Sequence, residues 1–364
     1  MVQTIARCKS CGLPIMASEN MEWLPDGTIM TRRLKGVRLV VLDQEMTARI
    51  MGALASQERG DLKAQIKGAT RYVVGKMFSG LIGKLPRYDV VKKRLLEAME
   101  GFSLLLGMGR MEVERLAPAQ EGRILLKKPF DLCLATAVIM GVLEETDRCF
   151  YAFEHEREGR SDYRLTLEAV EEGAYSPDPF AWLPIQYQGR KGSFDMERCR
   201  DCGLPLAVRE FVWDELSGTV NIGGGRCRVG FLPWYITAVM AHMAGCEEAG
   251  GYAALLEEAS CLSALSALQS MEGGAGNAYI GEPDLWKRPH GDKRRLAGEV
   301  LAVRGWGMVE EFEMGAREWK MTVKNPVDAA LVAGWLRALY TFTLGREPRL
   351  KVTEDIDVAR CVLK

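Results

Sequence analysis

A short cysteine-containing sequence occurs twice in this chain. Residues 7–14 and residues 198–205 both contain the pattern Cys-x-x-Cys-Gly-Leu-Pro, preceded in each case by an arginine. Each copy is followed by a tryptophan and then by a Gly-Thr turn: Trp23 and Gly27-Thr28 in the first copy, Trp213 and Gly218-Thr219 in the second. Because so many matches recur in the same order, the sequence predicts an internal duplication.

The similarity returns near the end of each half. A Gly-x-Gly segment, at 107–109 in the first half and at 305–307 in the second, leads to a proline-containing segment that ends in aspartate. That segment is 128–131 in the first half and 325–328 in the second. The two halves therefore share their beginnings and their ends, while their middles agree only in pattern.

The chain length also favours two folded units. A single hydrophobic core rarely serves more than roughly 250 residues, and this chain has 364. We assign residues 1–171 to a first repeat and 197–364 to a second. Residues 172–196 between them are rich in proline and glycine without periodicity, which is typical of a linker.

The local patterns predict an α+β fold for each half. In the first half we expect strands at 21–24, 28–32 and 37–42, with a tight turn at Asp26-Gly27, and helices at 44–57, 61–82 and 88–106. Each half then closes with two strands, a helix and two strands: 109–117, 122–127, 130–145, 149–156 and 162–168, then 307–314, 317–324, 327–344, 347–353 and 357–363. Such a module is an antiparallel sheet covered on one face by helices.

Several residues of these closing modules point to a known family. In the second half they are Gly305-Trp306-Gly307, Asn325-Pro326, the helical segment 333–340, Gly345-Arg346-Glu347 and the strand 352–354; in the first half they are 107–110, Pro129-Phe130, Gly141 and Glu144-Glu145. On these residues, each module resembles the 4-vinyl-reductase-like domain family, also called hydrocarbon-binding domains. The resemblance implies small-molecule sensor or binding modules that pair about a two-fold axis, so that a tandem copy forms a pseudo-dimer within one chain.

The same resemblance bears on the location of a metal. Members of the family often hold zinc with an acidic residue and cysteines of the last strand pair. Of such a set, the second half of this chain keeps Glu354 and Cys361, and the matching stretch 154–167 of the first half has no cysteine. This departure from the family pattern favours a metal site at the Cys-x-x-Cys turns that open the two halves. We call these two turns the knuckles.

The knuckle cysteines predict one zinc site shared by the two halves. In a long chain without a secretory signal, cysteines stay reduced, and Cys-x-x-Cys pairs are typical metal ligands. Cys8, Cys11, Cys199 and Cys202 are the cysteines placed alike in both halves, and two such pairs complete a tetrahedral set of four thiolates. The glycine after each pair allows the positive φ that a metal-binding turn needs. Four thiolates leave no position for water, so the zinc would be structural.

The cysteines also allow other interpretations. Each knuckle can find its own acidic ligands nearby: Glu19, Glu22 or Asp26 for the first, and Glu210, Asp214 or Glu215 for the second. An iron–sulfur cluster held by four cysteines is a less favoured cofactor than zinc. A redox pair is disfavoured because such a pair usually begins a helix, whereas short strands are expected here. Free structural thiols are the remaining alternative.

Charge and hydropathy exclude some partners. The formal net charge is -1 at pH 7, which gives no general attraction to a phosphate backbone. No apolar stretch approaches the roughly 18 residues of a membrane span, and the N-terminus lacks the apolar segment of a secretory signal. We therefore expect a cytoplasmic protein without a nucleic-acid partner or a membrane span.

The predicted function is a non-catalytic, zinc-containing tandem module that binds a small hydrophobic ligand or a partner protein. The three histidines are isolated, and motifs of metalloproteases, serine hydrolases and phosphate loops are missing. Trp306, Trp335 and Tyr340 are candidates for lining a ligand pocket, although aromatic residues at helical spacing more often fill a core. The alternatives are an enzyme or enzyme accessory in anaerobic aromatic, tetrapyrrole or C1 metabolism, suggested by the family name, and a structural subunit of a larger complex.

Overall fold

The computed structural model describes residues 5–32, 36–55, 68–75, 89–116, 121–147, 149–170, 187, 189–222, 227–233, 249–270, 283–287, 292–355 and 357–364. Residues 68–75 are helical, and the labelled elements in chain order are α1 (Ile15–Asn20), β1 (Met21–Trp23), β2 (Ile29–Thr31), β3 (Arg38–Asp43), α2 (Gln44–Ala55), α4 (Asp89–Leu106), β4 (Arg110–Leu116), β5 (Glu121–Lys127), α5 (Leu132–Asp147), β6 (Phe150–Glu158), β7 (Asp162–Val170), η1 (Leu206–Glu210), β8 (Val212–Asp214), β9 (Thr219–Ile222), β10 (Cys227–Pro233), α7 (Ala249–Ser270), α8 (Pro283–Lys287), α9 (Lys293–Val303), β11 (Met308–Met314), β12 (Trp319–Lys324), α10 (Ala329–Leu344), β13 (Leu350–Asp355) and β14 (Val358–Leu363). The described strands form three antiparallel sheets with helices, so the α+β class is confirmed.

The chain divides into two compact units. One consists mainly of Glu58–Ile185 with Trp213–Val220, and the other of Ile5–Gln57, Gln186–Val212 and Asn221–Lys364. Each unit thus contains one closing module together with the β-hairpin segment that comes from the other half of the sequence. A compact unit and a sequence repeat are different divisions, so the predicted repeat boundaries stay a prediction. Most of the predicted linker lies outside the described residues.

The strands that follow both knuckles form one sheet in the order β1-β2-β3-β10-β9-β8. The predicted turn at Asp26-Gly27 is confirmed, because β1 and β2 pair antiparallel with Trp23 opposite Ile29 and Gly27 has φ 78. In the middle of the sheet, β3 and β10 pair antiparallel with Val41 opposite Phe231. The order read from either edge is therefore the same: the first, second and third strand after a knuckle.

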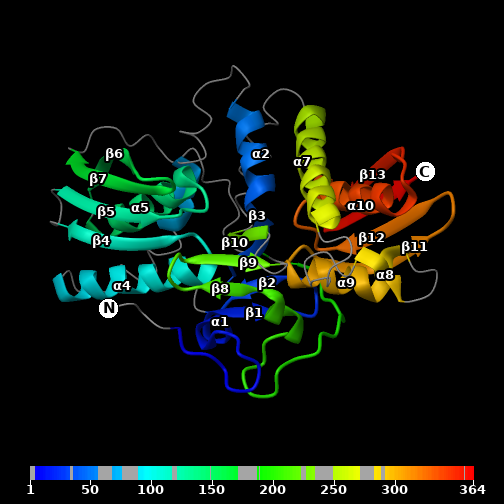
Figure 1. The fold of residues 1–364 in the computed structure, drawn as a ribbon, viewed down its shortest axis with the longest axis horizontal. Helices are drawn as coiled ribbons and strands as arrows, with labels where there is room; N and C mark the ends of the chain where they lie inside the picture. The colour runs from blue at the N-terminus through cyan, green and yellow to red at the C-terminus, as the bar shows by residue number, and fades with distance from the viewer. Residues whose placement is uncertain are drawn as a thin grey trace. The chain divides into compact units, whose positions relative to one another are not determined.

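Both closing modules have the predicted order of two strands, a helix and two strands. Their sheets run β4-β5-β7-β6 and β11-β12-β14-β13, and each has a bulge on its first strand, at Val113/Arg115 and at Val309/Glu311. Figure 1 shows α5 across the first of these sheets and α10 across the second. Asp328 caps α10 by accepting hydrogen bonds from the backbone N–H of Ala330 and Leu331, which stabilises the first turn.

The helix that precedes each closing module, α4 or α9, contacts a hairpin from the other half through a matching hydrogen bond. The indole N–H of Trp23 donates to the carbonyl of Val303 at 3.0 Å. In the other unit, the indole N–H of Trp213 donates to the carbonyl of Leu105 at 2.9 Å. Both tryptophans are buried, so these bonds satisfy indole donors that have no access to water.

A buried arginine adds a polar contact between β3 and the second module. The Arg38 guanidinium is 1% exposed and donates to the backbone carbonyls of Gly305 and Asn325, each at 2.7 Å. Burial lowers the pKa of Arg38, and the carbonyl oxygens replace the water that the charge has lost. Arg38 therefore has a structural role.

The element after each knuckle differs from the prediction. A short helix, α1 after the first knuckle and η1 after the second, precedes the first strand. Each begins directly after a proline, Pro14 or Pro205, with φ -58, a value that is compatible with entry into a helix. The expected helix at 61–82 is described at 68–75, and its other residues lie outside the described ranges. Within the described residues, none of the helices has both the length and the apolar character required to cross a bilayer.

Candidate metal centre

The two knuckles fold into the same hydrogen-bonded turn. In the first, the N–H of Cys8 donates to the carbonyl of Leu13 and the N–H of Gly12 donates to the carbonyl of Cys8, both at 2.8 Å. The second knuckle repeats these two bonds at 2.9 Å between Cys199, Leu204 and Gly203. The φ angles of the two glycines are 76 and 73, which confirms the positive φ predicted for this position.

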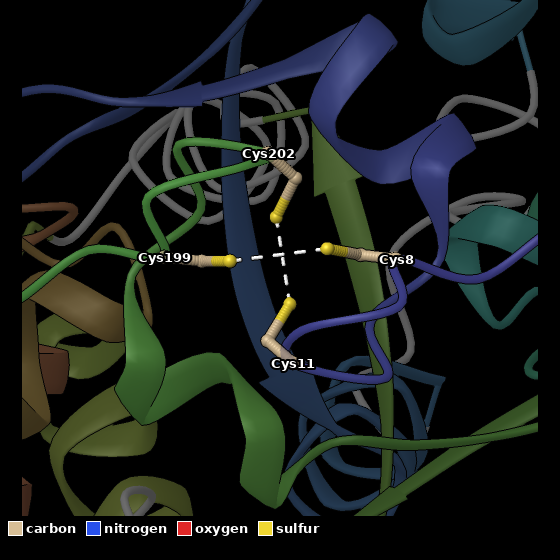
Figure 2. Close-up of side chains that lie close together, drawn as sticks. All are labelled: Cys8, Cys11, Cys199 and Cys202. Atoms are coloured by element: carbon tan, nitrogen blue, oxygen red, sulfur yellow. Dashed lines mark hydrogen bonds between the residues drawn. The ribbon is translucent and has the colours of Figure 1, made fainter.

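The four knuckle thiols converge on one point. The Sγ atoms of Cys8 and Cys199 are 3.8 Å apart, and those of Cys11 and Cys202 are 3.5 Å apart. All four sulfur atoms lie within 4.8 Å of one another. Figure 2 shows the thiols of the two turns pointing toward a common centre, with Cys8 and Cys11 on one side and Cys199 and Cys202 on the other.

These distances suit a single metal ion. Four sulfurs bound to one zinc at about 2.3 Å in a tetrahedron lie about 3.8 Å from one another. The Cys8–Cys199 and Cys11–Cys202 separations are close to this value. An iron–sulfur cluster places several iron atoms between its cysteines and requires the thiolates to stand farther apart, so the geometry favours a mononuclear ion.

The knuckle thiols differ in how readily they lose a proton. Partial burial raises the pKa of Cys11 to about 12 and also raises the pKa of Cys202. The Cys199 thiolate, by contrast, accepts hydrogen bonds from the backbone N–H of Cys202 and then Asp201, which lower its pKa to about 7. Four thiolates at these separations would repel one another strongly, and a bound dication would compensate for that repulsion.

An arginine hydrogen-bonds to the backbone of each knuckle. The guanidinium of Arg7 donates to the carbonyl of Gly12 at 3.2 Å, and that of Arg198 donates to the carbonyl of Gly203 at 3.0 Å. A zinc ion with four thiolates would carry two negative charges, which a nearby cation would offset. The arginine in front of each cysteine pair is visible in the sequence repeat.

The two knuckles also meet through a polar contact. The hydroxyl of Ser10 donates a hydrogen bond to the carboxylate of Asp201. These residues occupy the same place in the two knuckles, immediately before the second cysteine. Sequence reasoning did not identify this contact, because a Ser-to-Asp difference between the copies gives no sign that the two positions face each other.

The acidic residues considered as rival ligands are engaged elsewhere or lie outside the cluster. The carboxylate of Asp26 accepts from the hydroxyl of Thr28 at 2.6 Å, and that of Asp214 accepts from the hydroxyl of Ser217 at 2.6 Å. Among the residues that the structure describes, we searched for three or more His, Cys, Asp or Glu side chains whose ligand atoms lie close enough to hold one metal ion. The four knuckle cysteines form such a group. Glu354 and Cys361 take part in no such group there.

The structure shows no disulfide bond among the cysteines that it describes. There are nine of them, and Cys246 lies outside the described ranges. Neither knuckle pair begins a helix, since α1 starts at Ile15 and η1 at Leu206. The redox interpretation therefore gains no support from the position of the pairs.

The three candidate ligand-lining residues are packed in the second module. Trp306, Trp335 and Tyr340 are each 0–1% exposed. The indole N–H of Trp306 donates to the carbonyl of Val41 at 2.9 Å, and the Trp335 ring packs edge-on against Trp286 at 6.0 Å. These protein contacts agree with the core-filling alternative, and the role in ligand binding stays a prediction.

Comparisons of the chain with protein-family models, with curated proteins and with solved structures found no match.

Proposed function

We propose that the four knuckle cysteines bind one structural zinc ion that links the two halves of the chain. The observation that carries this proposal is the approach of the four thiols to within 4.8 Å of one another, two from each knuckle. Zinc is favoured over other ions because four thiolates in a closed tetrahedral set are its typical structural site. The backbone N–H donors around Cys199 stabilise its thiolate form.

The ion would supply stability rather than catalysis. Four thiolates occupy its whole tetrahedral shell, so neither water nor substrate can bind to it. Bound at residues 8 and 11 on one side and 199 and 202 on the other, it would close a very long loop of the chain. Closing such a loop restricts the unfolded ensemble and stabilises the folded state.

We further propose that the two halves form a pseudo-dimer about an axis through this site. Equivalent residues face each other across that axis: Cys8 faces Cys199, Cys11 faces Cys202, and Ser10 contacts Asp201. The central strands follow the same rule when Arg38 is aligned with Arg228, because Val41 then corresponds to Phe231 and lies opposite it. Contacts between equivalent residues are the signature of a two-fold interface.

The wider role we propose is that of a non-catalytic binding module for a small hydrophobic ligand. The order of elements in both closing modules supports the proposed relation to the 4-vinyl-reductase-like family. The first module is the better candidate for the binding site, because its core has partly buried apolar side chains around it: Leu95, Val113, Leu116, Leu132, Val138, Cys149, Phe153 and Ala169. In the second module, the position equivalent to Val138 is the fully buried Trp335.

Metal analysis tests the zinc proposal directly. Protein purified without added metal should contain one zinc per chain, with the four knuckle thiols protected from a thiol reagent under native conditions. Elemental mass spectrometry combined with mass mapping of the labelled cysteines measures both quantities. Two zinc ions per chain would mean that each knuckle completes its own site, and four freely reactive knuckle thiols without metal would exclude the proposal.

Ligand binding by the first module can be tested by thermal unfolding. A medium-chain fatty acid or a two-ring aromatic compound that binds should raise the melting temperature, with a stabilisation of about 2.7 kcal/mol at a hundredfold excess over Kd. Val138→Trp should abolish the shift, since the larger ring fills the space beside α5. Val212→Trp, at a half-exposed site, is the control and should keep it. Equal shifts in both variants would place binding elsewhere.

A further inference from the structure

A second helix crosses the central helix of each module at a glycine. A Cβ atom at Gly141 of α5 would lie 2.7 Å from the carbonyl oxygen of Arg71, and one at Gly334 of α10 would lie 2.1 Å from the carbonyl oxygen of Glu257. Both distances are too short for a side chain, so only glycine allows this approach. Arg71, in the helix of residues 68–75, and Glu257, in α7, therefore make the same close backbone contact with a central helix, at the tenth residue of α5 and at the sixth residue of α10.

An ion pair follows one turn beyond each glycine. In the first module, Arg71 Nε lies 3.0 Å from Glu144 Oε2. In the second, Arg337 Nη1 lies 3.1 Å from Glu257 Oε1. Glu144 and Arg337 both lie three residues after their glycine. The polarity is reversed, because the crossing helix carries the cation in the first module and the anion in the second.

We propose that this reversed polarity specifies which crossing helix packs on which module. The inference rests on the proposed duplication, since two similar modules present similar surfaces to both helices. The glycine contact is common to both modules and does not discriminate. An exchange would instead place Arg71 against Arg337 and Glu257 against Glu144. All four side chains are at most 26% exposed, so the like-charge contacts would be only partly screened by water.

A polarity-matched variant tests this pairing rule. Arg71→Glu combined with Glu144→Arg keeps an ion pair in the first module and gives both modules the same polarity. We expect natively purified protein to melt close to the wild type. After unfolding and refolding, the fraction of chains with the helix of residues 68–75 on α10 should rise roughly tenfold as the repulsion is removed. Cross-linking followed by mass spectrometry measures that fraction.

Two further variants keep the test decisive. Reversal of the exposed pair Arg94 and Glu97 in α4 is the matched control and should refold like the wild type. Arg71→Gln with Glu144→Gln removes the repulsion without new charges, and should raise the exchanged fraction in the same direction if the polarity-matched variant folds poorly. An exchanged fraction at the wild-type level in both test variants would overturn the inference. Zinc content measured on the same samples reports separately on the proposed metal site.

Discussion

Cys8→Ser should remove the entire zinc content of the chain and lower its free energy of unfolding by at least ~3 kcal/mol. The loss is large because a structural zinc contributes its binding energy to folding, and a serine hydroxyl is a poor replacement for a thiolate. Cys199→Ser should have the same effect, since both residues belong to one set of four. Elemental analysis and calorimetric unfolding measure the two quantities.

The controls separate the shared site from its rivals. Cys133→Ser removes a half-buried thiol outside the cluster and should leave the zinc content unchanged. A chelator should lower the melting temperature of the wild type to that of Cys8→Ser and have no effect on the variant. If each knuckle held its own ion, each single variant would lose half of the zinc, and this outcome would contradict the shared site.

The cysteine site could be predicted from the sequence because its chemistry depends on local spacing. A Cys-x-x-Cys turn followed by glycine forms the same structure in both copies, as the φ angles of Gly12 and Gly203 show. Joining the two turns required only the assumption that copies of one sequence pair symmetrically. The closing modules were predicted to within a few residues for a similar reason, since strand and helix periods are local signals.

Contacts between distant residues could not be predicted in this way. The bond from Trp23 to Val303 and that from Trp213 to Leu105 each join a hairpin of one half to the helix that precedes the closing module of the other half. No local pattern distinguishes this exchange from packing within the same half. The helices after the knuckles were missed because a single turn of helix has no periodicity, although Pro14 and Pro205 were signals for their start.

Gly27→Ala should be the most disruptive single-methyl change in the hairpin between β1 and β2. An added Cβ would lie 2.2 Å from both the carbonyl carbon and the carbonyl oxygen of Gly307, and neither backbone atom can rotate away. The N–H of Gly307 also donates to the carbonyl of Gly27 at 3.1 Å, so the two segments cannot separate without losing that bond. Strain at positive φ adds to this overlap, and we expect a loss of roughly 3–5 kcal/mol.

Gly345→Ala isolates the contribution of the overlap. Gly345 has φ 66, similar to the φ 78 of Gly27, but an added Cβ there would meet no atom within 4 Å. Its variant should therefore lose only the ~1 kcal/mol that a left-handed conformation costs an alanine. Urea unfolding of both variants measures the difference. Because the knuckle turns do not include Gly27, native Gly27→Ala protein should keep its zinc. A loss no greater than that of Gly345→Ala would mean that this hairpin does not lie against the second module.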